Sequence, residues 1–547
     1  MKLHLPSSVG PRPWPSERSI LFVALLFLPL RGWADEDRPS SPTRENWKLL
    51  APLQVERLDN GMTFLLYPNR RAPIFSAVLR FNVGGKDELP GSTGIAHMFE
   101  HMAFKGTRRV GTTDWKDEQA ALKRVDEAAE AFDGARERLI AQGTDPRAMA
   151  RELAPLRAVL QAAQKAAGRY VVKDEFDQIY QREGADDLNA MTSSDSTTYF
   201  VSLPANRIEL WAKMESERLS QPVLREFYSE RDVVMEERRM RNDNSPQGRL
   251  WDLAMATAFI ANSYRYPVIG WESDIRNLTA PQALEFFRTH YSPERAVGAL
   301  VGDLDIAAAR KLLRETFGKI PRYEGPPPPR SVVPEPTQQG ERRAVLRLDA
   351  QPELLMAWHK PSVPSIDDVR AQALMEALTG GRSARWFEQL VKRDRLAANV
   401  STFTGPGDAQ PNLFIVDATP AGATTLAELE QALRREAARL REQPIAKDEL
   451  ERARKRLVAN TTRALENNLG LAMQLAESAQ LSGDPWYLER RLRQLEAVTP
   501  DDLLAFAKKY LVDTNLTVGL LEPPAQSGAR VAPATGASVT SGTERQR

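Results

Sequence analysis

Short apolar runs alternate with longer segments of helical spacing along most of the chain. Runs rich in Val, Ile, Leu, Phe and Tyr are typical of buried strands, and apolar residues three and four apart are typical of a helix packed on a core. The runs predict strands over residues 53–55, 62–67, 74–83, 188–191, 197–203, 296–301, 344–348, 354–358, 411–419 and 516–521. The spacing predicts helices over residues 207–219, 228–240, 366–378, 425–443 and 447–480.

Turn and cap residues mark two of these boundaries. Asn60-Gly61 lies between two apolar runs and predicts a tight hairpin, because both residues tolerate positive φ. Ser365 and Asp368 are expected to cap the helix over residues 366–378, and Gly380-Gly381 to end it.

Residues 115–168 differ in composition from their surroundings. They are rich in Ala, Glu, Arg, Lys, Gln and Leu, and a break at residues 143–146 divides them. Asp145 is a suitable N-cap and Pro146 suits the first helical position, so the segment predicts a charged helical hairpin. We interpret this hairpin as a solvated structural insert without chemistry of its own.

A helix-then-strand segment recurs in both halves of the chain. In each copy a proline begins a helix, apolar residues follow at helical spacing, and a strand comes next. We infer a duplicated domain, because four matched pairs share one and the same sequence offset: Pro281 and Pro500, Leu284 and Leu503, Phe287 and Phe506, Tyr291 and Tyr510.

The length of 547 residues exceeds what one hydrophobic core supports. A proline-rich stretch near the middle is typical of a stiff, extended linker. The end of the chain is rich in Ala, Gly, Ser, Thr and Pro, which predicts a disordered tail. We therefore expect a first domain at residues 45–322, which includes the hairpin, a linker at 323–340, a second domain at 341–523 and the tail at 524–547.

The start of the chain, up to Ala34, has the features of an export signal. Lys2, Arg12 and Arg18 make a basic front, residues 20–30 are apolar, and Gly32-Trp33-Ala34 offers small residues for a signal peptidase. This apolar run is too short to span a bilayer of about 30 Å. We expect a cleaved signal peptide over residues 1–34 and a periplasmic protein with no stable membrane span. The alternative is an uncleaved anchor or a buried helix.

The composition narrows the chemistry. Lys and Arg number 74 against 73 Asp and Glu, and no basic block interleaves with aromatic residues, so nothing indicates a nucleic-acid partner. The chain has no cysteine, which excludes disulfides and thiolate metal ligands. Any bound zinc must therefore be held by nitrogen and oxygen atoms.

Two of only five histidines, His97 and His101, lie four residues apart in an apolar run, with Glu100 beside the second. On a helix, positions i and i+4 share one face, so both imidazoles would point at one spot with Glu100 near it. Two imidazoles and a carboxylate at one point are what a catalytic zinc site needs. The alternative is two histidines in an apolar core, which would leave the Glu100 carboxylate buried at a cost.

Further acidic residues lie downstream, in the helix predicted over residues 228–240. Glu230 and Glu237 are seven residues apart and share nearly the same face, whereas Glu236 is rotated from it by about 100°. This pattern alone favours a salt-bridged surface helix.

Taken together, these motifs resemble the pitrilysin, insulinase and mitochondrial processing peptidase family, whose zinc motif is the inverted HxxEH. The resemblance extends over residues 50–523 and is tighter in the first half. It is found in residues 94–107 around the histidines, in Leu188-Asn189-Ala190-Met191-Thr192 with Asp195, Thr197 and Tyr199, in residues 230–237 and in residues 266–271.

The resemblance implies an α+β fold of two similar domains, each a mostly antiparallel sheet with helices packed on one side, together forming a clamshell. It implies one Zn²⁺ per chain held by His97, His101 and Glu237, with Glu230 supporting these ligands. Glu100 would be the general base. A peptide substrate would lie as an added strand along the edge that carries Asn189 and Ala190.

The chain departs from the family pattern in two ways. The gap between His101 and Glu237 is longer than in compact members, and the hairpin accounts for the excess. The family also grips substrate with an arginine and a tyrosine of the second domain, and residues 413–417 contain neither. We therefore expect a homodimer, or a heterodimer with a related subunit that supplies them.

The predicted function is that of a zinc endopeptidase acting on extended or unfolded peptides. One alternative is a non-catalytic, peptide-binding subunit of a processing peptidase complex. A third reading is a metal-binding esterase or other hydrolase.

Overall fold

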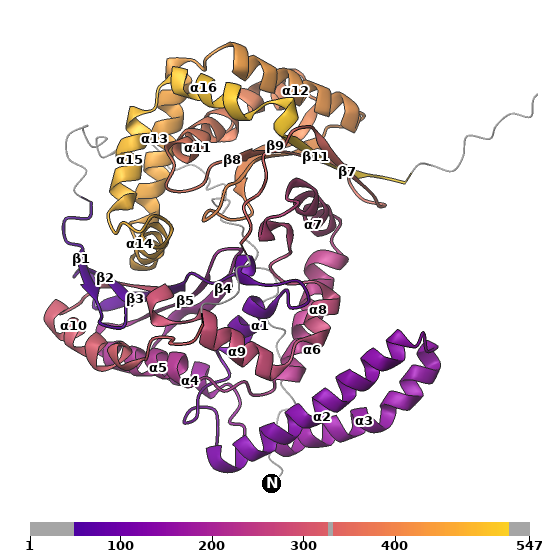
Figure 1. The fold of residues 1–547 in the computed structure, drawn as a ribbon. Helices are drawn as coiled ribbons and strands as arrows, with labels where there is room; N and C mark the ends of the chain where they lie inside the picture. The colour runs from indigo at the N-terminus through magenta and orange to yellow at the C-terminus, as the bar shows by residue number, and fades with distance from the viewer. Residues whose placement is uncertain (1–48, 327–331, 525–547) are drawn as a thin grey trace, which may run out of the picture. The chain divides into compact units, whose positions relative to one another are not determined.

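The computed structural model describes residues 49–326 and 332–524 (Figure 1). The predicted signal peptide, and the predicted C-terminal tail apart from residue 524, lie outside the described residues. Two sheets organise the described part, one in each half of the chain. None of the helices within these ranges is long and apolar enough to cross a membrane.

The first sheet has the strand order β1-β2-β6-β3-β5-β4. Its neighbouring strands are antiparallel except β2 and β6, which are parallel. The strands are β1 (Gln54–Arg57), β2 (Thr63–Pro68), β3 (Ile74–Phe81), β4 (Asp186–Thr192), β5 (Thr197–Pro204) and β6 (Ala296–Gly302).

The second sheet has the order β7-β11-β8-β10-β9 and is antiparallel except between β7 and β11. Its strands are β7 (Arg342–Arg347), β8 (Glu353–Lys360), β9 (Ala397–Gly405), β10 (Asn412–Pro420) and β11 (Leu516–Glu522). Apart from β1, the two sheets correspond strand for strand, including the place of the single parallel pair. The predicted pair of similar α+β domains with mostly antiparallel sheets is therefore confirmed.

Helices of each half cover one face of their own sheet and form its main core with it. The first half contains α1 (Ile95–Met102), α2 (Trp115–Ala141), α3 (Pro146–Ala167), α4 (Glu175–Arg182), α5 (Ile208–Ser220), α6 (Phe227–Arg238), α7 (Pro246–Ala258), α8 (Glu272–Asn277), α9 (Ala280–His290) and α10 (Ile306–Glu315). The second contains α11 (Ile366–Thr379), α12 (Leu426–Glu442), α13 (Lys447–Ala464), α14 (Asn468–Ser482), α15 (Tyr487–Ala497) and α16 (Pro500–Tyr510).

The two halves also exchange one helix each. Leu471 and Leu475 of α14 pack on Leu65, Val78 and Ala299, on the face of the first sheet that its own helices leave open. In return, α7 packs its apolar side on strands β8, β10 and β11 of the second sheet. Each sheet is therefore covered on its second face by a helix from the other half, which the sequence pattern did not predict.

Two predicted boundaries are wrong. The helix predicted over residues 447–480 is two helices, because the Asn467 side chain accepts a hydrogen bond from Gly470 N–H (2.6 Å) and begins α14. The turn at Asn60-Gly61 is longer than a tight hairpin, since Arg57 pairs with Thr63 and only Gly61 takes a positive φ, of 92°.

One predicted cap is half right. The Ser365 hydroxyl accepts a hydrogen bond from Asp367 N–H (3.2 Å) and begins α11. Asp368 does not complete the cap, because its carboxylate is fully buried and accepts a hydrogen bond from Lys360 Nζ (2.7 Å). The charge of Lys360 in the core requires this partner.

Candidate metal centre

Close contacts and hydrogen bonds fix the N-terminal end of helix α1. Gly94 takes a left-handed φ of 88°, and a Cβ at this position would lie 2.5 Å from the carbonyl oxygen of Ile269. The buried Glu88 carboxylate accepts hydrogen bonds from Gly94 N–H (2.8 Å) and Ala96 N–H (2.9 Å), at the positive end of the helix. The start of α1, and with it the direction of its side chains, is therefore defined.

His97 and His101 lie one turn apart on α1 and meet Glu237 of α6. Glu237 Oε2 lies 3.3 Å from His101 Nε2 and 3.8 Å from His97 Nε2. One ligand atom of each residue lies within 4.8 Å of the others, and no other group of three or more His, Asp or Glu residues in the described ranges meets this condition. The structure thus brings together three residues that are far apart in the sequence.

These three residues fit a zinc ion. Catalytic zinc sites use three protein ligands from His, Asp or Glu and leave a fourth position open. Bonds of about 2.0–2.1 Å at a tetrahedral angle place ligand atoms roughly 3.3–3.4 Å apart. The two distances to Glu237 Oε2, 3.3 and 3.8 Å, are close to that spacing.

Glu230 lies on α6 two turns before Glu237 and contacts the other ring nitrogen of His101. Its Oε1 is 3.0 Å from His101 Nδ1, and its Oε2 is 2.8 Å from Lys105 Nζ. Burial opposes ionisation, but the hydrogen bonds to His101 and Lys105 lower the pKa of Glu230 to about 2. The carboxylate therefore holds a proton on Nδ1 and turns Nε2 of His101 towards Glu237. No role was predicted for Lys105 from the sequence, although it lies within residues 94–107, four positions after His101.

Their surroundings shift the pKa values of the two histidines in opposite directions. Burial and the neighbouring His101 lower the pKa of His97 to about 3, so this imidazole is neutral near neutral pH. Burial also opposes the charge on His101, but Glu230 and Glu237 outweigh it and raise its pKa to about 9. Burial likewise opposes the charge on Glu237, but His101, His97 and Arg241 lower its pKa to about 2.

Glu237 and its neighbour Glu236 point in different directions. The Glu236 side chain is 57% exposed and pairs with Arg239 (2.9 Å), whereas Glu237 is 14% exposed and also pairs with Arg241. The surface-helix interpretation is therefore wrong for Glu237, and it fits Glu236. The face assigned to Glu237 by its spacing from Glu230 is the face that meets the histidines.

Glu100 is a residue of α1, and its side chain reaches the edge strand β4 of the first sheet. Its Oε2 accepts a hydrogen bond from the hydroxyl of Thr192 (2.6 Å), the last residue of β4. Burial raises the pKa of Glu100, although the Thr192 hydrogen bond and the charge on His101 act in the opposite direction. The role of the Thr192 hydroxyl was not visible in the sequence, because the two residues are 92 positions apart.

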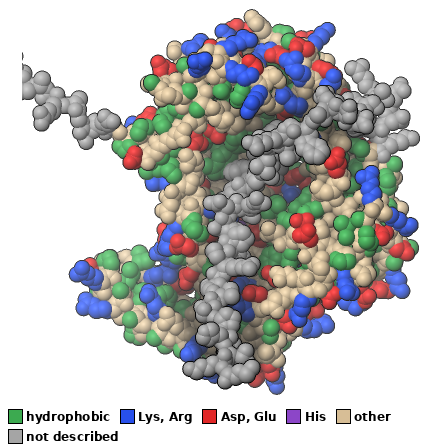
Figure 2. Space-filling model, turned by 180° about the vertical axis from the view of Figure 1, so that it is seen from behind, with side chains coloured by type: hydrophobic (Ala, Val, Ile, Leu, Met, Phe, Trp, Pro, Cys, Tyr) green, Lys and Arg blue, Asp and Glu red, His purple; other side chains and the backbone are tan. Residues whose placement is uncertain are grey.

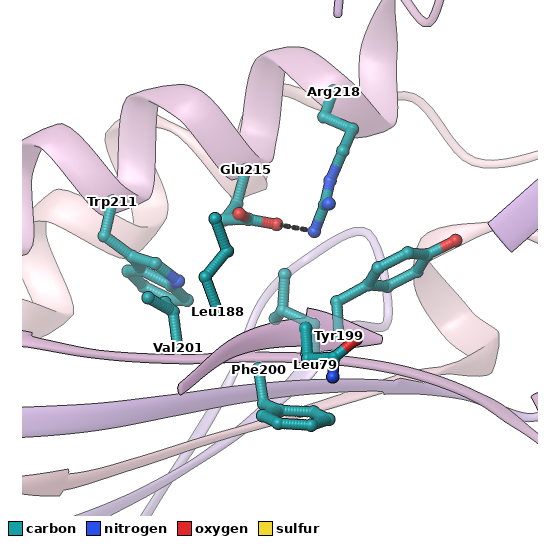
Figure 3. Close-up of a pocket in the computed structure, with 9 residues that line it drawn as sticks. Leu79, Leu188, Tyr199, Phe200, Val201, Trp211, Glu215 and Arg218 are labelled. Atoms are coloured by element: carbon teal, nitrogen blue, oxygen red, sulfur yellow. Dashed lines mark hydrogen bonds and ion pairs between the residues drawn. The ribbon is translucent and has the colours of Figure 1, made fainter. Parts of the chain in front are cut away.

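Strand β4, which carries Asn189 and Ala190, is an edge strand of the first sheet. Asn189 pairs with Phe200 and Ala190 with Tyr199 of β5, and β4 has no strand on its other side within the sheet. Figure 3 shows Leu188 of this strand beside the ion pair of Glu215 and Arg218. The Arg218 guanidinium lies 4.1 Å from the ring centre of Tyr199. These side chains line a small pocket behind the edge strand.

The surface charge is mixed on the face seen in Figure 2. Lys and Arg side chains lie among Asp and Glu side chains and do not gather into one basic patch on that face. This distribution matches the near balance of 74 basic and 73 acidic residues.

The chain is similar to several known proteins. The model of the "Peptidase M16 inactive domain" matches residues 277–457, a segment that begins after Glu237 and contains none of the candidate metal ligands. The zinc protease PqqE of Helicobacter pylori is 26% identical over 472 residues, which cover 85% of this chain and 92% of that protein. An uncharacterized zinc protease of Streptomyces coelicolor is 24% identical over 438 residues, which cover 79% of this chain and 81% of that protein.

Solved structures show the same fold. The crystal structure of a protease from Helicobacter pylori matches with a TM-score of 0.71 at 24% identity, and the match covers 86% of this chain and 99% of that one. The periplasmic protease PqqL from Escherichia coli matches with a TM-score of 0.62 at 16% identity, over 90% of this chain and 52% of that one.

Proposed function

Because the chain belongs to the peptidase M16 family, we propose that it is a zinc-dependent endopeptidase that hydrolyses extended or unfolded peptides. One observation carries the proposal: His97, His101 and Glu237 place two imidazole nitrogens and one carboxylate oxygen around one point. Relatives that cover most of this chain are named zinc proteases, which supports the same chemistry.

In this proposal His97, His101 and Glu237 hold one Zn²⁺. A bound zinc ion would supply Lewis acidity, which makes a water molecule acidic near neutral pH and polarises the scissile carbonyl. Glu100 takes the proton of the attacking water at Oε1 and returns it to the leaving amine. The Thr192 hydroxyl donates to Oε2 of Glu100 and leaves Oε1 to accept this proton. Glu230 keeps His101 in the orientation that presents Nε2.

The substrate is proposed to bind along β4. An extended peptide can add to an edge strand through main-chain hydrogen bonds, here to Asn189, Ala190 and their neighbours. Such binding depends little on side chains, so we expect modest sequence specificity. A folded protein cannot supply a free strand, so it would be cleaved only where it unfolds.

The proposal includes a partner subunit. Strand β10 contains neither arginine nor tyrosine in the sequence Asn-Leu-Phe-Ile-Val-Asp-Ala-Thr-Pro, where the family keeps its second-domain substrate grip. We propose a homodimer, or a heterodimer with a related subunit, that supplies these groups. The oligomeric mass in solution tests this part.

A second candidate function is a non-catalytic, peptide-binding subunit. The family model that matches residues 277–457 carries the name of an inactive domain, and this match favours the alternative. Against it, the candidate ligands and Glu100 all lie outside the matched segment. Such a subunit would bind peptide and leave it intact.

One experiment separates the candidates. The purified protein is analysed for metal content and incubated with fluorogenic peptide and ester panels, with and without a chelator. A zinc endopeptidase should contain about one zinc per chain and cleave peptides only in the absence of chelator. Peptide binding without cleavage would support the non-catalytic subunit, and preferential ester cleavage would support another hydrolase.

The proposed location is the periplasm, after removal of the signal peptide. N-terminal sequencing of the exported protein should give a start near Asp35. A protein that begins at Met1 would contradict the proposed processing.

A further inference from the structure

The inserted hairpin is only partly solvated, because one face of α2 is buried against the first half. Its apolar residues Ala121, Val125, Ala129 and Phe132 belong to the same core as Val234 of α6. The interpretation of the hairpin as a solvated insert is therefore wrong for this face of α2.

Three acidic residues of α2 contact the segment of α6. Glu118, Asp126 and Asp133, here called the acidic ladder, follow one another in steps of eight and seven residues. On a helix, Asp126 and Asp133 are only about 20° apart and Glu118 is about 80° from Asp126, so the three lie on one side of α2 at spacings of about 12 and 10 Å along its axis. Each of the three contacts a residue at or just before α6, the helix that carries Glu237.

The first contact of the acidic ladder, here called a rung like the other two, joins Glu118 of α2 to Arg225, which also bonds to the loop after the histidines. Glu118 is 0% exposed and accepts two hydrogen bonds from Arg225, which is 1% exposed: 2.6 Å from Nε and 2.9 Å from Nη2. Arg225 lies just before α6, and its Nη1 also donates to the carbonyl oxygen of Lys105 (2.9 Å). One buried ion pair thus ties together α2, the loop that follows α1, and the start of α6.

The other two rungs hold α6 itself. Asp126 Oδ1 accepts a hydrogen bond from the Tyr228 hydroxyl (3.2 Å), and Asp133 Oδ2 accepts one from Arg231 Nη1 (2.9 Å). Arg231 Nη1 also donates to the carbonyl oxygen of Leu278 (2.9 Å). Asp133 is held in place by Arg136, whose Nη1 lies 2.7 Å from its Oδ1.

These contacts lie on the flank of α6, away from the face that meets the histidines. At 100° per residue, Arg231 is rotated by about 100° from Glu230, and Tyr228 by about 160°. Glu230 and Glu237 are only about 20° apart, so both remain directed at α1 while the flank is held. A rotation of α6 would move Glu237 away from His97 and His101, and the ladder opposes that rotation.

We infer that α2 is a positioning element of the metal centre: its acidic ladder fixes α6 at the rotation that presents Glu237 to the two histidines. The inference rests on the proposed function, because it concerns the affinity for zinc. None of the three acidic residues touches the metal site. A weakened ladder should therefore lower the affinity of the folded protein for zinc, whereas a contact with a structural role alone would lower only the melting temperature.

The test compares variants of the full chain in which one rung is removed. Asp133→Asn removes the charge that faces Arg231 and Arg136, and Tyr228→Phe is a milder change that removes only the hydroxyl bonded to Asp126. The matched control is Glu127→Gln, on the exposed face of the same helix, where Glu127 pairs with Lys123 at 3.8 Å. Zinc affinity is measured by competition with a chelator, well below the melting temperature of each apoprotein.

We expect Asp133→Asn to weaken zinc binding about tenfold, the lower end of the range for residues that support metal ligands. Tyr228→Phe should change it in the same direction, and Glu127→Gln should bind as the wild type does. If Asp133→Asn fails to fold, Tyr228→Phe decides. Wild-type affinity in folded rung variants would overturn the inference and leave the proposed function intact. A wild-type protein that binds no zinc would overturn both.

Discussion

At the level of single residues, the site depends on which carboxylate of α6 faces the histidines. Periodicity was enough to place His97 and His101 on one helical face, since they are four residues apart. It could not identify Glu237, because a helix with this charge pattern also suits a solvated surface. Only the family resemblance named Glu237, and Lys105 and Thr192 were missed because periodicity does not encode their contacts.

The two neighbouring acids give a test of this assignment. Glu237→Gln should lose most of the bound zinc, because it replaces an anionic ligand with a neutral amide that is a weak zinc ligand. Glu236→Gln should keep zinc at the wild-type level, since its side chain points to solvent and pairs with Arg239. Zinc content after dialysis gives the answer. The assignment fails if Glu236→Gln is the variant that loses zinc.

At the level of elements, the strands and helices that were predicted followed the hydrophobic pattern closely, but no helix was predicted at α4, α7, α8, α10 or α15. The errors occurred where side chains decide the boundary: Asn467 divides one long helical pattern into α13 and α14, and Asp368 pairs with a buried lysine and leaves the cap to Ser365. Strand β9 was not predicted, because residues 397–405 are mostly small and polar. Such strands depend on pairing with a neighbour more than on their own pattern.

Strand β10 gives a prediction on the pH dependence of stability. Burial, with a contribution from Glu353, raises the pKa of Asp417 to about 7, well above its value of 3.8 in an unfolded chain. The protonated form therefore favours the fold: this stability is fully present below about pH 4 and is lost as the pH rises through 7. Asp417→Asn should raise the free energy of unfolding at pH 8, by up to about 4 kcal/mol, with little change at pH 4.

Urea denaturation at the two pH values measures the effect. Asp349→Asn is the matched control, because Asp349 is exposed in the loop after β7 and should show little change at either pH. An equal effect of Asp417→Asn at pH 4 and pH 8 would contradict the raised pKa.

At the level of the whole molecule, the duplication was visible in the sequence as a single offset shared by four residue pairs. The matching strand orders of the two sheets confirm two similar domains. The exchange of α7 and α14 was not visible, because an apolar helix face does not reveal which sheet it will cover. The exchange means that each half completes the core of the other.

The exchange predicts that the halves unfold together. Leu475 of α14 is fully buried on the first sheet, and Leu475→Ala should cost about 2–5 kcal/mol. Because both halves share this core, unfolding should remain one transition with a lower midpoint. Leu89→Ala is the control, since Leu89 is 40% exposed and should change stability little. Two separate transitions in the wild type, with only one of them shifted by Leu475→Ala, would show that the halves are independent.

The proposed zinc endopeptidase is tested most directly by the cleavage of an unfolded peptide by zinc-loaded wild type and Glu100→Gln, at equal zinc content. We expect the wild type to cleave the peptide and Glu100→Gln to keep about one zinc per chain while its rate falls by roughly 10²–10⁴-fold, the contribution of a general base. Cleavage at the wild-type rate by Glu100→Gln, or no cleavage by the zinc-loaded wild type, would contradict it.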